Sequence, residues 1–243
     1  MLTQEELSRY RRQVIIPGWG AAGQEKLKKA RVLVAGAGGL GSAVLSYLVA
    51  AGVGRIRVID NDRVELSNLN RQVIHSASSI GQPKVMSAFD RLSAINPCVA
   101  VEPIMATIGE NNVLDLVGDN PIVDAMDNLP ARLLLNRAAL SRNLPLFHGA
   151  VYGFEGRVTT ILPRRTGCLA CLYQGVVAGE VPVLGAVPGV IGCIQATEVI
   201  KYVLGMGELL ADRMLIYDGL NSTFTEVKLR KNPACKECCA TLS

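Results

Sequence analysis

Short apolar runs alternate with amphipathic segments over the first 145 residues. Three runs have the length and composition of buried strands: residues 31–36, 55–60 and 121–126. Three segments carry apolar residues at helical spacing: residues 42–51, 83–95 and 131–141. A strand, a helix and a second strand in this order predict a βαβ unit with parallel strands and a right-handed crossover.

The pattern differs at the two ends of the chain. The first residues predict two short helices, Gln4 to Arg12 and Gln24 to Lys29. After residue 145 the apolar positions alternate, and the predicted strands lie within residues 147–162, 214–218 and 223–229. A Gly-rich stretch then precedes an apolar helix expected over 190–204. We therefore expect one doubly wound, Rossmann-like α/β fold whose sheet is mixed in its C-terminal half.

Composition narrows the class of protein. A hydrophobic fraction of 49% in 243 residues is ample for one large core. The net charge of +4 is too weak to indicate nucleic acid binding, but it suits an anionic substrate. The polar N-terminus has no signal-peptide pattern, and Gly and charged residues interrupt the apolar stretches well short of a membrane span. We expect a soluble, cytoplasmic protein without a membrane or nucleic acid partner.

A glycine-rich turn follows the first predicted strand. The four glycines of the G-x-G-x-x-G pattern are Gly36, Gly38, Gly39 and Gly41. Such a turn between a strand and a helix lets backbone amides approach a phosphate closely. Asp60 ends the next strand, about 20 residues further on, where an acid binds a ribose hydroxyl in dinucleotide-binding folds. The pattern predicts nucleotide binding but leaves the nucleotide open, and an NAD-dependent oxidoreductase is the main alternative.

Charged residues after the ribose-binding strand favour a triphosphate over NAD. Arg71 and Lys84 lie in segments that could fold back over the phosphates, where cations stabilise the charge that develops in nucleotidyl transfer. Asp127 follows the strand at 121–126, so its carboxylate is placed to bind Mg²⁺. Each residue also has a plainer interpretation. The two cations could be solvated surface charges, and Asp127 could be the N-cap of the helix that begins near Pro130.

Six motifs, in this order, cover almost the whole chain. They are Arg9-Tyr-Arg-Arg12-Gln13, Gly36 to Gly41, Asp60 to Gln72 with its Leu-Ser-Asn68-Leu-Asn-Arg71-Gln run, Gly81-Gln-Pro-Lys84, Asp124 to Asn128, and two C-x-x-C pairs. Together they resemble the MoeB/ThiF/HesA family of prokaryotic enzymes, which are related to the ubiquitin-activating E1 enzymes. The resemblance implies a single adenylation domain over residues 1–243. It comprises a helical arm (1–30), a nucleotide-binding half (31–145) and a carrier-binding half with a zinc site (146–243).

The resemblance also implies a reaction and its components. Its substrate would be a small ubiquitin-like sulfur-carrier protein ending in Gly-Gly, adenylated with ATP and Mg²⁺ by a homodimer. Carried over residue by residue, Gly39 lies in the phosphate loop, Asp60 holds the ribose, and Asp127 binds Mg²⁺. The residues that would line the phosphates are Asn68, Arg71 and Lys84, and Arg12 would reach the nucleotide of the opposite subunit. Because a carboxylate is already ionised at neutral pH, no general base is needed, and we assign His75 and His148 to structural roles.

Seven cysteines occur in the chain, an odd number that argues against a disulfide framework. Four of them form the pairs Cys168–Cys171 and Cys235–Cys238, whose spacing suits a closed, tetrahedral, structural Zn²⁺ site. Free thiols or a redox motif are the alternatives, and Cys239 could be an accidental thiol or a competing ligand.

Some relatives carry a further cysteine between the first pair and the apolar helix, but the segment 172–187 has none here. This absence favours adenylation without covalent catalysis. Cys193 is the nearest thiol, and we expect it to be buried and structural on an apolar helix.

Two further classes of function remain open. One is an enzyme of the same fold that activates a free peptide terminus or modifies tRNA. The other is a zinc-stabilised binding module without catalytic activity, which the complete set of nucleotide-binding residues disfavours.

Overall fold

The computed structural model describes residues 1–173 and 182–239, and within them eight strands form one sheet in the order β3-β2-β1-β4-β5-β6-β7-β8. The strands are β1 (Arg31–Ala35), β2 (Arg55–Ile59), β3 (Ala100–Ile104), β4 (Ile122–Asp124), β5 (Leu146–Tyr152), β6 (Glu155–Ile161), β7 (Arg213–Asp218) and β8 (Thr223–Lys228). β1 to β5 pair in parallel, whereas the pairs β5–β6, β6–β7 and β7–β8 are antiparallel. The predicted doubly wound, mixed sheet is confirmed.

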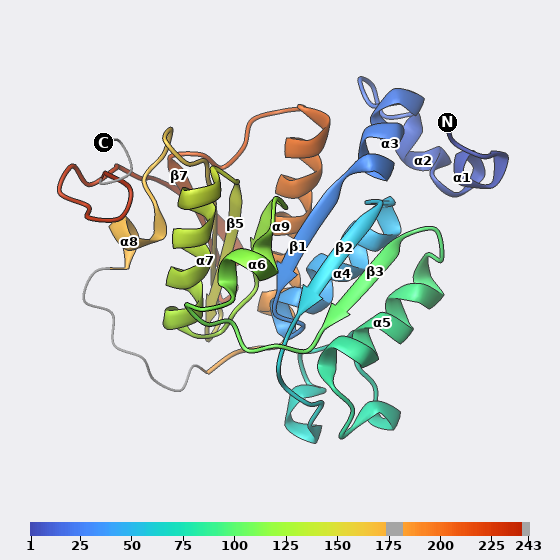
Figure 1. Cartoon of the computed structure of the whole chain (residues 1–243), viewed down its shortest axis with the longest axis horizontal. Coiled ribbons are helices and arrows are strands. Elements are labelled where there is room, and N and C mark those ends of the chain that lie inside the picture. The colour runs from blue at the N-terminus through green and yellow to red at the C-terminus, as the bar shows by residue number, and fades with distance from the viewer. Residues whose placement is uncertain (174–181, 240–243) are drawn as a thin grey trace.

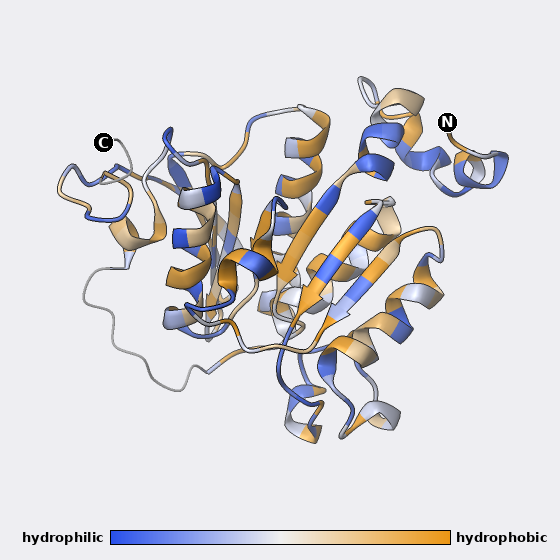
Figure 2. Ribbon diagram, in the orientation of Figure 1, coloured by the Kyte–Doolittle hydropathy of each residue, from blue (hydrophilic) through white to orange (hydrophobic). Residues whose placement is uncertain are grey.

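Helices cover both faces of this sheet (Figure 1). They are α1 (Gln4–Arg9), α2 (Arg11–Val14), α3 (Gly20–Lys29), α4 (Gly39–Ala51), α5 (Lys84–Ile95), α6 (Val113–Val117), α7 (Leu129–Arg142), α8 (Leu169–Leu172) and α9 (Ala186–Leu204). Alternate residues of β1 enter two separate cores, because successive strand side chains point to opposite faces. Val32 and Val34 pack with α4, α5 and α9, and Leu33 and Ala35 pack with α6, α7 and α8. Figure 2 shows β1 hydrophobic beyond its first residue, as these two cores require.

α9 packs directly on α4 and on strands β5 and β6. A Cβ on Gly192 would lie 2.6 Å from the carbonyl oxygen of Leu40, so the close crossing of α9 with α4 requires glycine there. By length and composition alone, α9 is also the one helix among the described residues that could cross a membrane. A helix buried in a protein core can be equally long and apolar, and α9 contributes Ile191 and Val199 to the core.

The N-terminal arm, α1 to α3, docks at the amino-terminal end of the parallel strands (Figure 1). Gln13 and Gln24 donate side-chain hydrogen bonds to the carbonyl oxygen of Ala51, the last residue of α4, at 3.1 and 2.8 Å. The Nδ2 of Asn96, just after α5, donates to the hydroxyl of Tyr10 at 2.8 Å. Both helices run antiparallel to the strands, so their C-terminal ends lie opposite the glycine-rich turn. The arm is therefore remote from the turn of its own chain.

Several element boundaries differ from those predicted. The helix expected over 4–12 is divided at Tyr10, a residue that is only 4% exposed. α4 begins at Gly39 instead of residue 42, α9 begins at Ala186 instead of residue 190, and Pro83 is the N-cap of α5. The expected Gly-rich stretch lies partly outside the described residues.

Neither β3 nor α6 was predicted from the sequence. β3 contains Pro103 and Glu102, and it is the edge strand where a missing ladder donor is tolerated. α6 is only five residues long, too short for a periodic pattern to be recognised.

Candidate active site

A cavity of about 620 Å³ opens at the carboxyl ends of β1, β2 and β4. In an open α/β sheet, ligands usually bind at the carboxyl ends of the strands, beside the position where the strand order reverses. The lining residues are Gly36, Gly38, Gly39, Leu40, Asp60, Asn61, Asp62, Arg71, Gln72, Lys84, Thr107, Ala125, Met126, Asp127, Asn128, Arg132, Val151, Val183 and Pro188. Most of the predicted nucleotide-binding residues therefore meet in one place.

The glycine-rich turn closes in a way that only glycine permits. Gly36 has a φ of +103°, and a Cβ there would lie 2.5 Å from the carbonyl oxygen of Ala125. A Cβ on Gly41 would lie 2.0 Å from the carbonyl oxygen of Gly36. Gly38 is different, because a Cβ there would meet only the amide of Gln72, at 3.7 Å. Gly38 is the N-cap of α4 and provides no side-chain cap, so the amides of the first turn are suited to an anion.

Asp60 ties the turn to the following loop. Its two carboxylate oxygens accept hydrogen bonds from the backbone amides of Ala37 and Asp62, each at 2.8 Å. Burial raises the pKa of Asp60, and these two bonds oppose the rise by stabilising the charged form. Each oxygen keeps a second lone pair, which a ribose hydroxyl could use.

The two predicted cations both line the cavity. Lys84 is only 6% exposed, and its Nζ donates to Oδ2 of Asp62 at 2.7 Å. Arg71 donates through Nη1 to the carbonyl oxygen of Ser67 at 2.8 Å and to Oδ1 of Asn70 at 3.0 Å. The interpretation of Lys84 as a solvated surface charge is therefore wrong, since this lysine is buried and paired.

Three predicted residues lie outside the cavity lining: Gly41, which packs against Gly36 within the turn, Asn68 and Arg12. Asn68 is 8% exposed, and its Oδ1 accepts from the amide of Glu65 at 3.1 Å, which caps a 3-10 turn (Leu66–Asn68) just before Arg71. Arg12 is exposed on α2, at the opposite end of the sheet from the cavity. Neither side chain reaches the cavity of its own chain in this structure.

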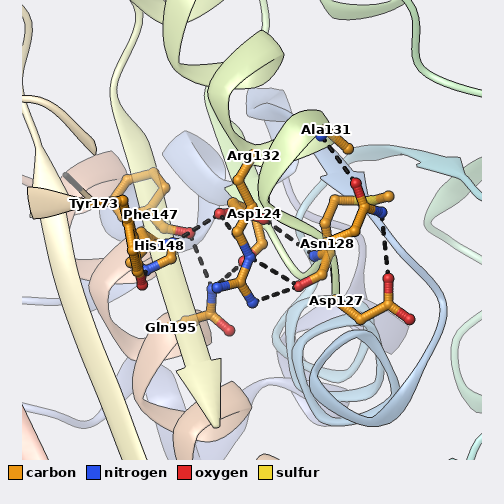
Figure 3. Close-up of polar contacts among 10 residues, drawn as sticks. Asp124, Asp127, Asn128, Ala131, Arg132, Phe147, His148, Tyr173 and Gln195 are labelled. Atoms are coloured by element: carbon orange, nitrogen blue, oxygen red, sulfur yellow. Dashed lines mark hydrogen bonds and ion pairs between the residues drawn. The ribbon is translucent and has the colours of Figure 1, made fainter. Parts of the chain in front are cut away.

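The carboxylate of Asp127 has few hydrogen-bond partners. The N-cap of α7 is Asn128, whose Oδ1 accepts from the amide of Ala131 at 2.9 Å, so the interpretation of Asp127 as the cap is wrong (Figure 3). The Oδ1 of Asp127 accepts only from Nδ2 of Asn128, at 3.3 Å, among the described residues. An exposed carboxylate at the end of a parallel strand is a suitable ligand for Mg²⁺, which needs one or two such groups besides phosphate oxygens.

Gln72, Arg132 and Thr107 line the cavity but were not predicted as site residues. Gln72 is 4% exposed, and its Oε1 has no hydrogen-bond partner among the described residues. Its position directly after Arg71 in the sequence motif could have indicated it. Arg132 lies one turn beyond Asn128 on α7, a position that the expected helix already implied. Thr107 follows β3, a strand that was not predicted from the sequence, and so no signal pointed to it.

Both histidines are buried and make hydrogen bonds through both ring nitrogens. His75 contacts Oγ of Ser87 and the carbonyl oxygen of Ala37, each at 2.9 Å, and so joins the glycine-rich turn to α5. His148 contacts Oδ2 of Asp124 and the hydroxyl of Tyr173, each at 2.7 Å. Burial lowers the pKa of both imidazoles, which keeps them neutral at pH 7.

The four paired cysteines converge on one point. The Sγ atoms of Cys168, Cys171, Cys235 and Cys238 all lie within 4.8 Å of one another. Individual separations are 4.0 Å for Cys168–Cys171, 3.8 Å for Cys168–Cys235 and 3.6 Å for Cys171–Cys238. Zinc–sulfur bonds of about 2.3 Å in a tetrahedron place sulfurs about 3.8 Å apart. The cluster therefore fits a tetrahedral ion, which would tie the C-terminal tail to α8.

The surroundings of this cluster fit the same conclusion. Burial raises the pKa of the Cys168 thiol to about 11, so a bound cation is needed to hold this sulfur as a thiolate at neutral pH. Cys239 is not a member of the cluster, because its Sγ contacts the carbonyl oxygen of Asn232 at 3.5 Å. An ion pair of 2.9 Å between Arg137 and Glu237 fastens the tail to α7.

Cys193 is partly exposed on α9, so the expectation that it is buried is wrong. Burial of part of the side chain still raises the pKa of its thiol, which lowers the thiolate fraction at neutral pH. The cysteine-free segment 172–187 falls partly outside the described residues.

Comparison with known proteins identifies the family of this chain. The model of the ThiF family matches residues 10–237. A sulfur carrier protein adenylyltransferase of Thermus thermophilus is 44% identical over 249 residues, covering 97% of this chain and 92% of the relative. A SAMP-activating enzyme E1 of Haloferax volcanii is 45% identical over 245 residues, covering 98% and 90%. The crystal structure of E. coli MccB with MccA-N7isoASN shares the fold, with a TM-score of 0.85 over 96% of this chain and 74% of that chain at 24% identity.

The fold and the cavity define a nucleotide-binding protein of the E1-like type. The chain belongs to the ThiF family.

Proposed function

We propose that the protein adenylates the C-terminal carboxylate of a small ubiquitin-like sulfur-carrier protein. A carboxylate oxygen attacks the α-phosphorus of ATP, the bond from that phosphorus to the bridging oxygen breaks, and pyrophosphate leaves. The observation that carries the proposal is the meeting of the glycine-rich turn, Arg71, Lys84 and Asp127 in one cavity. The relatives' names supply the substrate class, since they include a sulfur carrier protein adenylyltransferase.

The chain's own residues support the reaction through position and charge. The turn from Gly36 to Gly39 presents backbone amides, and Arg71 and Lys84 bring two cations to the same cavity. Cations held in place before the reaction stabilise the charge that develops on the leaving pyrophosphate. The attacking carboxylate is ionised at neutral pH and needs no base to remove a proton. This accounts for a cavity wall without a histidine among the described residues.

Asp127 is the proposed ligand for Mg²⁺, which would neutralise phosphate charge when bound with ATP. The four clustered cysteines would hold Zn²⁺ in a structural role, since four thiolates leave no open coordination position. An NAD-dependent oxidoreductase is disfavoured by the same cavity, because two cations and a free carboxylate suit a triphosphate with Mg²⁺ better than a nicotinamide ring.

We further propose a homodimer in which Arg12 serves the partner's cavity. The support is the arm's position at the far end of the sheet, which keeps Arg12 away from the cavity of its own chain. The carrier would end in Gly-Gly, because an unbranched tail can pass beside the glycine-rich turn without steric conflict. The expected location is the cytoplasm.

Exchange of labelled pyrophosphate into ATP tests the proposal. Exchange is expected only when a carrier ending in Gly-Gly is present. Asp127→Asn is expected to lower the exchange rate by about 100-fold, because it removes charge without changing volume. The matched control is Asp119→Asn, an exposed acid that precedes β4 at the far end of the strand, which should leave exchange unchanged. Carrier-independent exchange, or none with any carrier, would contradict the proposal.

A further inference from the structure

Asp124 is a fully buried carboxylate on which three structural elements converge (Figure 3). Its Oδ1 accepts from the amide of Met126 at 3.0 Å, and its Oδ2 lies 2.7 Å from Nδ1 of His148 and 3.9 Å from Nε of Arg132. Its carbonyl oxygen accepts from Nε2 of Gln195 at 2.9 Å. The last residue of β4 is thus fixed by β5, α7 and α9 together.

These contacts hold the peptide groups on both sides of Met126. The Met126 amide donates to Asp124, while its carbonyl oxygen accepts from Nε and Nη2 of Arg132 at 3.1 and 2.5 Å. Asp127 is the next residue, and its own side chain has only the weak contact with Asn128. The direction of the Asp127 carboxylate into the cavity therefore depends on the pair Asp124–Arg132.

His148 completes this arrangement from the neighbouring strand. It is the register partner of Asp124 in the parallel pair β4–β5, so both side chains point to the same face of the sheet. A carboxylate only accepts hydrogen bonds, so Nδ1 of His148 carries the proton. Burial lowers the pKa of this imidazole and keeps it neutral, so Nε2 accepts from the hydroxyl of Tyr173. The tautomer and the ring orientation are both determined.

We infer that His148 is a positioning residue for the proposed Mg²⁺ ligand Asp127, and that it acts through Asp124 and Arg132. The inference rests on the proposed function, since it takes Asp127 as the ligand. His148 is not among the cavity-lining residues, and it is not a catalytic residue. Partners that orient metal ligands through hydrogen bonds commonly determine metal affinity, and their loss costs about 10- to 100-fold.

Two substitutions at His148 separate positioning from packing. In His148→Asn the side-chain amide nitrogen can occupy the place of Nδ1 and still donate to Asp124, whereas in His148→Gln the amide lies near the place of Nε2. Tyr173→Phe is the matched control, because it removes only the hydroxyl beyond Nε2 and leaves the bond to Asp124. The readout is the Mg²⁺ concentration that gives half-maximal ATP binding in calorimetry without carrier, with the melting temperature measured in parallel.

We expect His148→Gln to raise the half-maximal Mg²⁺ concentration by about 10-fold, and His148→Asn and Tyr173→Phe to leave it within about twofold. If His148→Gln fails to fold, Asp124→Asn replaces it, because this change keeps the volume and removes the charge that pairs with Arg132. An unchanged Mg²⁺ dependence in His148→Gln or Asp124→Asn, whatever the melting temperature, overturns the inference. Failure of the unaltered protein to bind ATP with Mg²⁺ overturns the proposed function and this inference with it. Normal ATP binding without carrier-dependent exchange contradicts the proposed function alone.

Discussion

The Nζ of Lys84 lies 2.7 Å from the carboxylate of Asp62, at the wall of the candidate nucleotide cavity. Lys84 is 6% exposed, whereas the Asp62 side chain is 54% exposed and can turn away into solvent. The cation is thus held in place by a partner that can leave. A triphosphate entering the cavity would compete with Asp62 for this lysine, because phosphate oxygens carry more charge than one carboxylate.

This pair leads to a prediction of unequal effects for substitutions of its two members. Lys84→Met should lower the exchange rate by about 100-fold, because it removes one of the cations that stabilise the leaving pyrophosphate. Asp62→Asn should retain the rate within about threefold, because it removes only the competitor of the phosphates and spares the cation. ATP titrations of both variants provide the measurement. Equal losses in the two variants would show that the ion pair itself is required.

The cysteine cluster predicts bound zinc and a loss of stability without it. Purified protein should contain one zinc ion per chain, and Cys235→Ser should lose the ion. We expect the melting temperature to fall by about 10 °C, since structural zinc contributes several kcal/mol to folding. Cys239→Ser is the control, because its Sγ contacts the carbonyl oxygen of Asn232 outside the cluster. Metal analysis and thermal unfolding check both changes, and full stability after removal of the metal would contradict a structural role.

The distance of Arg12 from its own cavity predicts complementation between subunits. Arg12→Ala and Lys84→Met should each be about 100-fold less active alone, while a mixture with exchanged subunits should recover activity. A heterodimer would hold one site with both cations intact, and a cation supplied by a partner can accelerate phosphoryl chemistry by orders of magnitude. Exchange of subunits is verified by mass spectrometry under native conditions. No recovery after verified exchange would count against the shared site.

The absence of cysteine from segment 172–187 predicts that no covalent link forms between enzyme and carrier. Cys193→Ala should keep at least about half of the activity, because the raised pKa of this thiol makes it a poor nucleophile. Denaturing gels and intact mass spectrometry without reductant check for a thioester. An adduct that disappears in Cys193→Ala would show that this prediction is wrong.

Three of the cavity residues that the sequence predicted share a simple physical origin. Gly36, Asp60 and Asp127 all follow parallel strands, whose carboxyl ends meet at one edge of a sheet. A strand pattern and a position just beyond it are therefore enough to place them together. The cysteine cluster was predictable for a similar reason, since the spacing within each pair brings both sulfurs close enough to bind one metal ion.

What the sequence left open depends on contacts between distant segments. Asp124 and His148 are opposite one another only because β4 and β5 pair in one particular register, which no local pattern encodes. Asp127 and Asn128 are adjacent, and both residue types are good N-caps. Which of them caps α7 depends on where the helix begins. The burial of Lys84 likewise depends on the fold of the loop that carries Asp62.

The measurement that tests the central claim most directly is the mass of the carrier itself. A carrier ending in Gly-Gly, incubated with the protein, ATP and Mg²⁺ in the presence of pyrophosphatase, should gain the mass of one adenylyl group. The gain should require the last glycine, because the terminal carboxylate is the group that attacks the α-phosphorus. It should also disappear with Asp127→Asn and persist with Asp119→Asn. A carrier that keeps its original mass while ATP is converted to ADP, or that gains mass without its last glycine, would contradict the account.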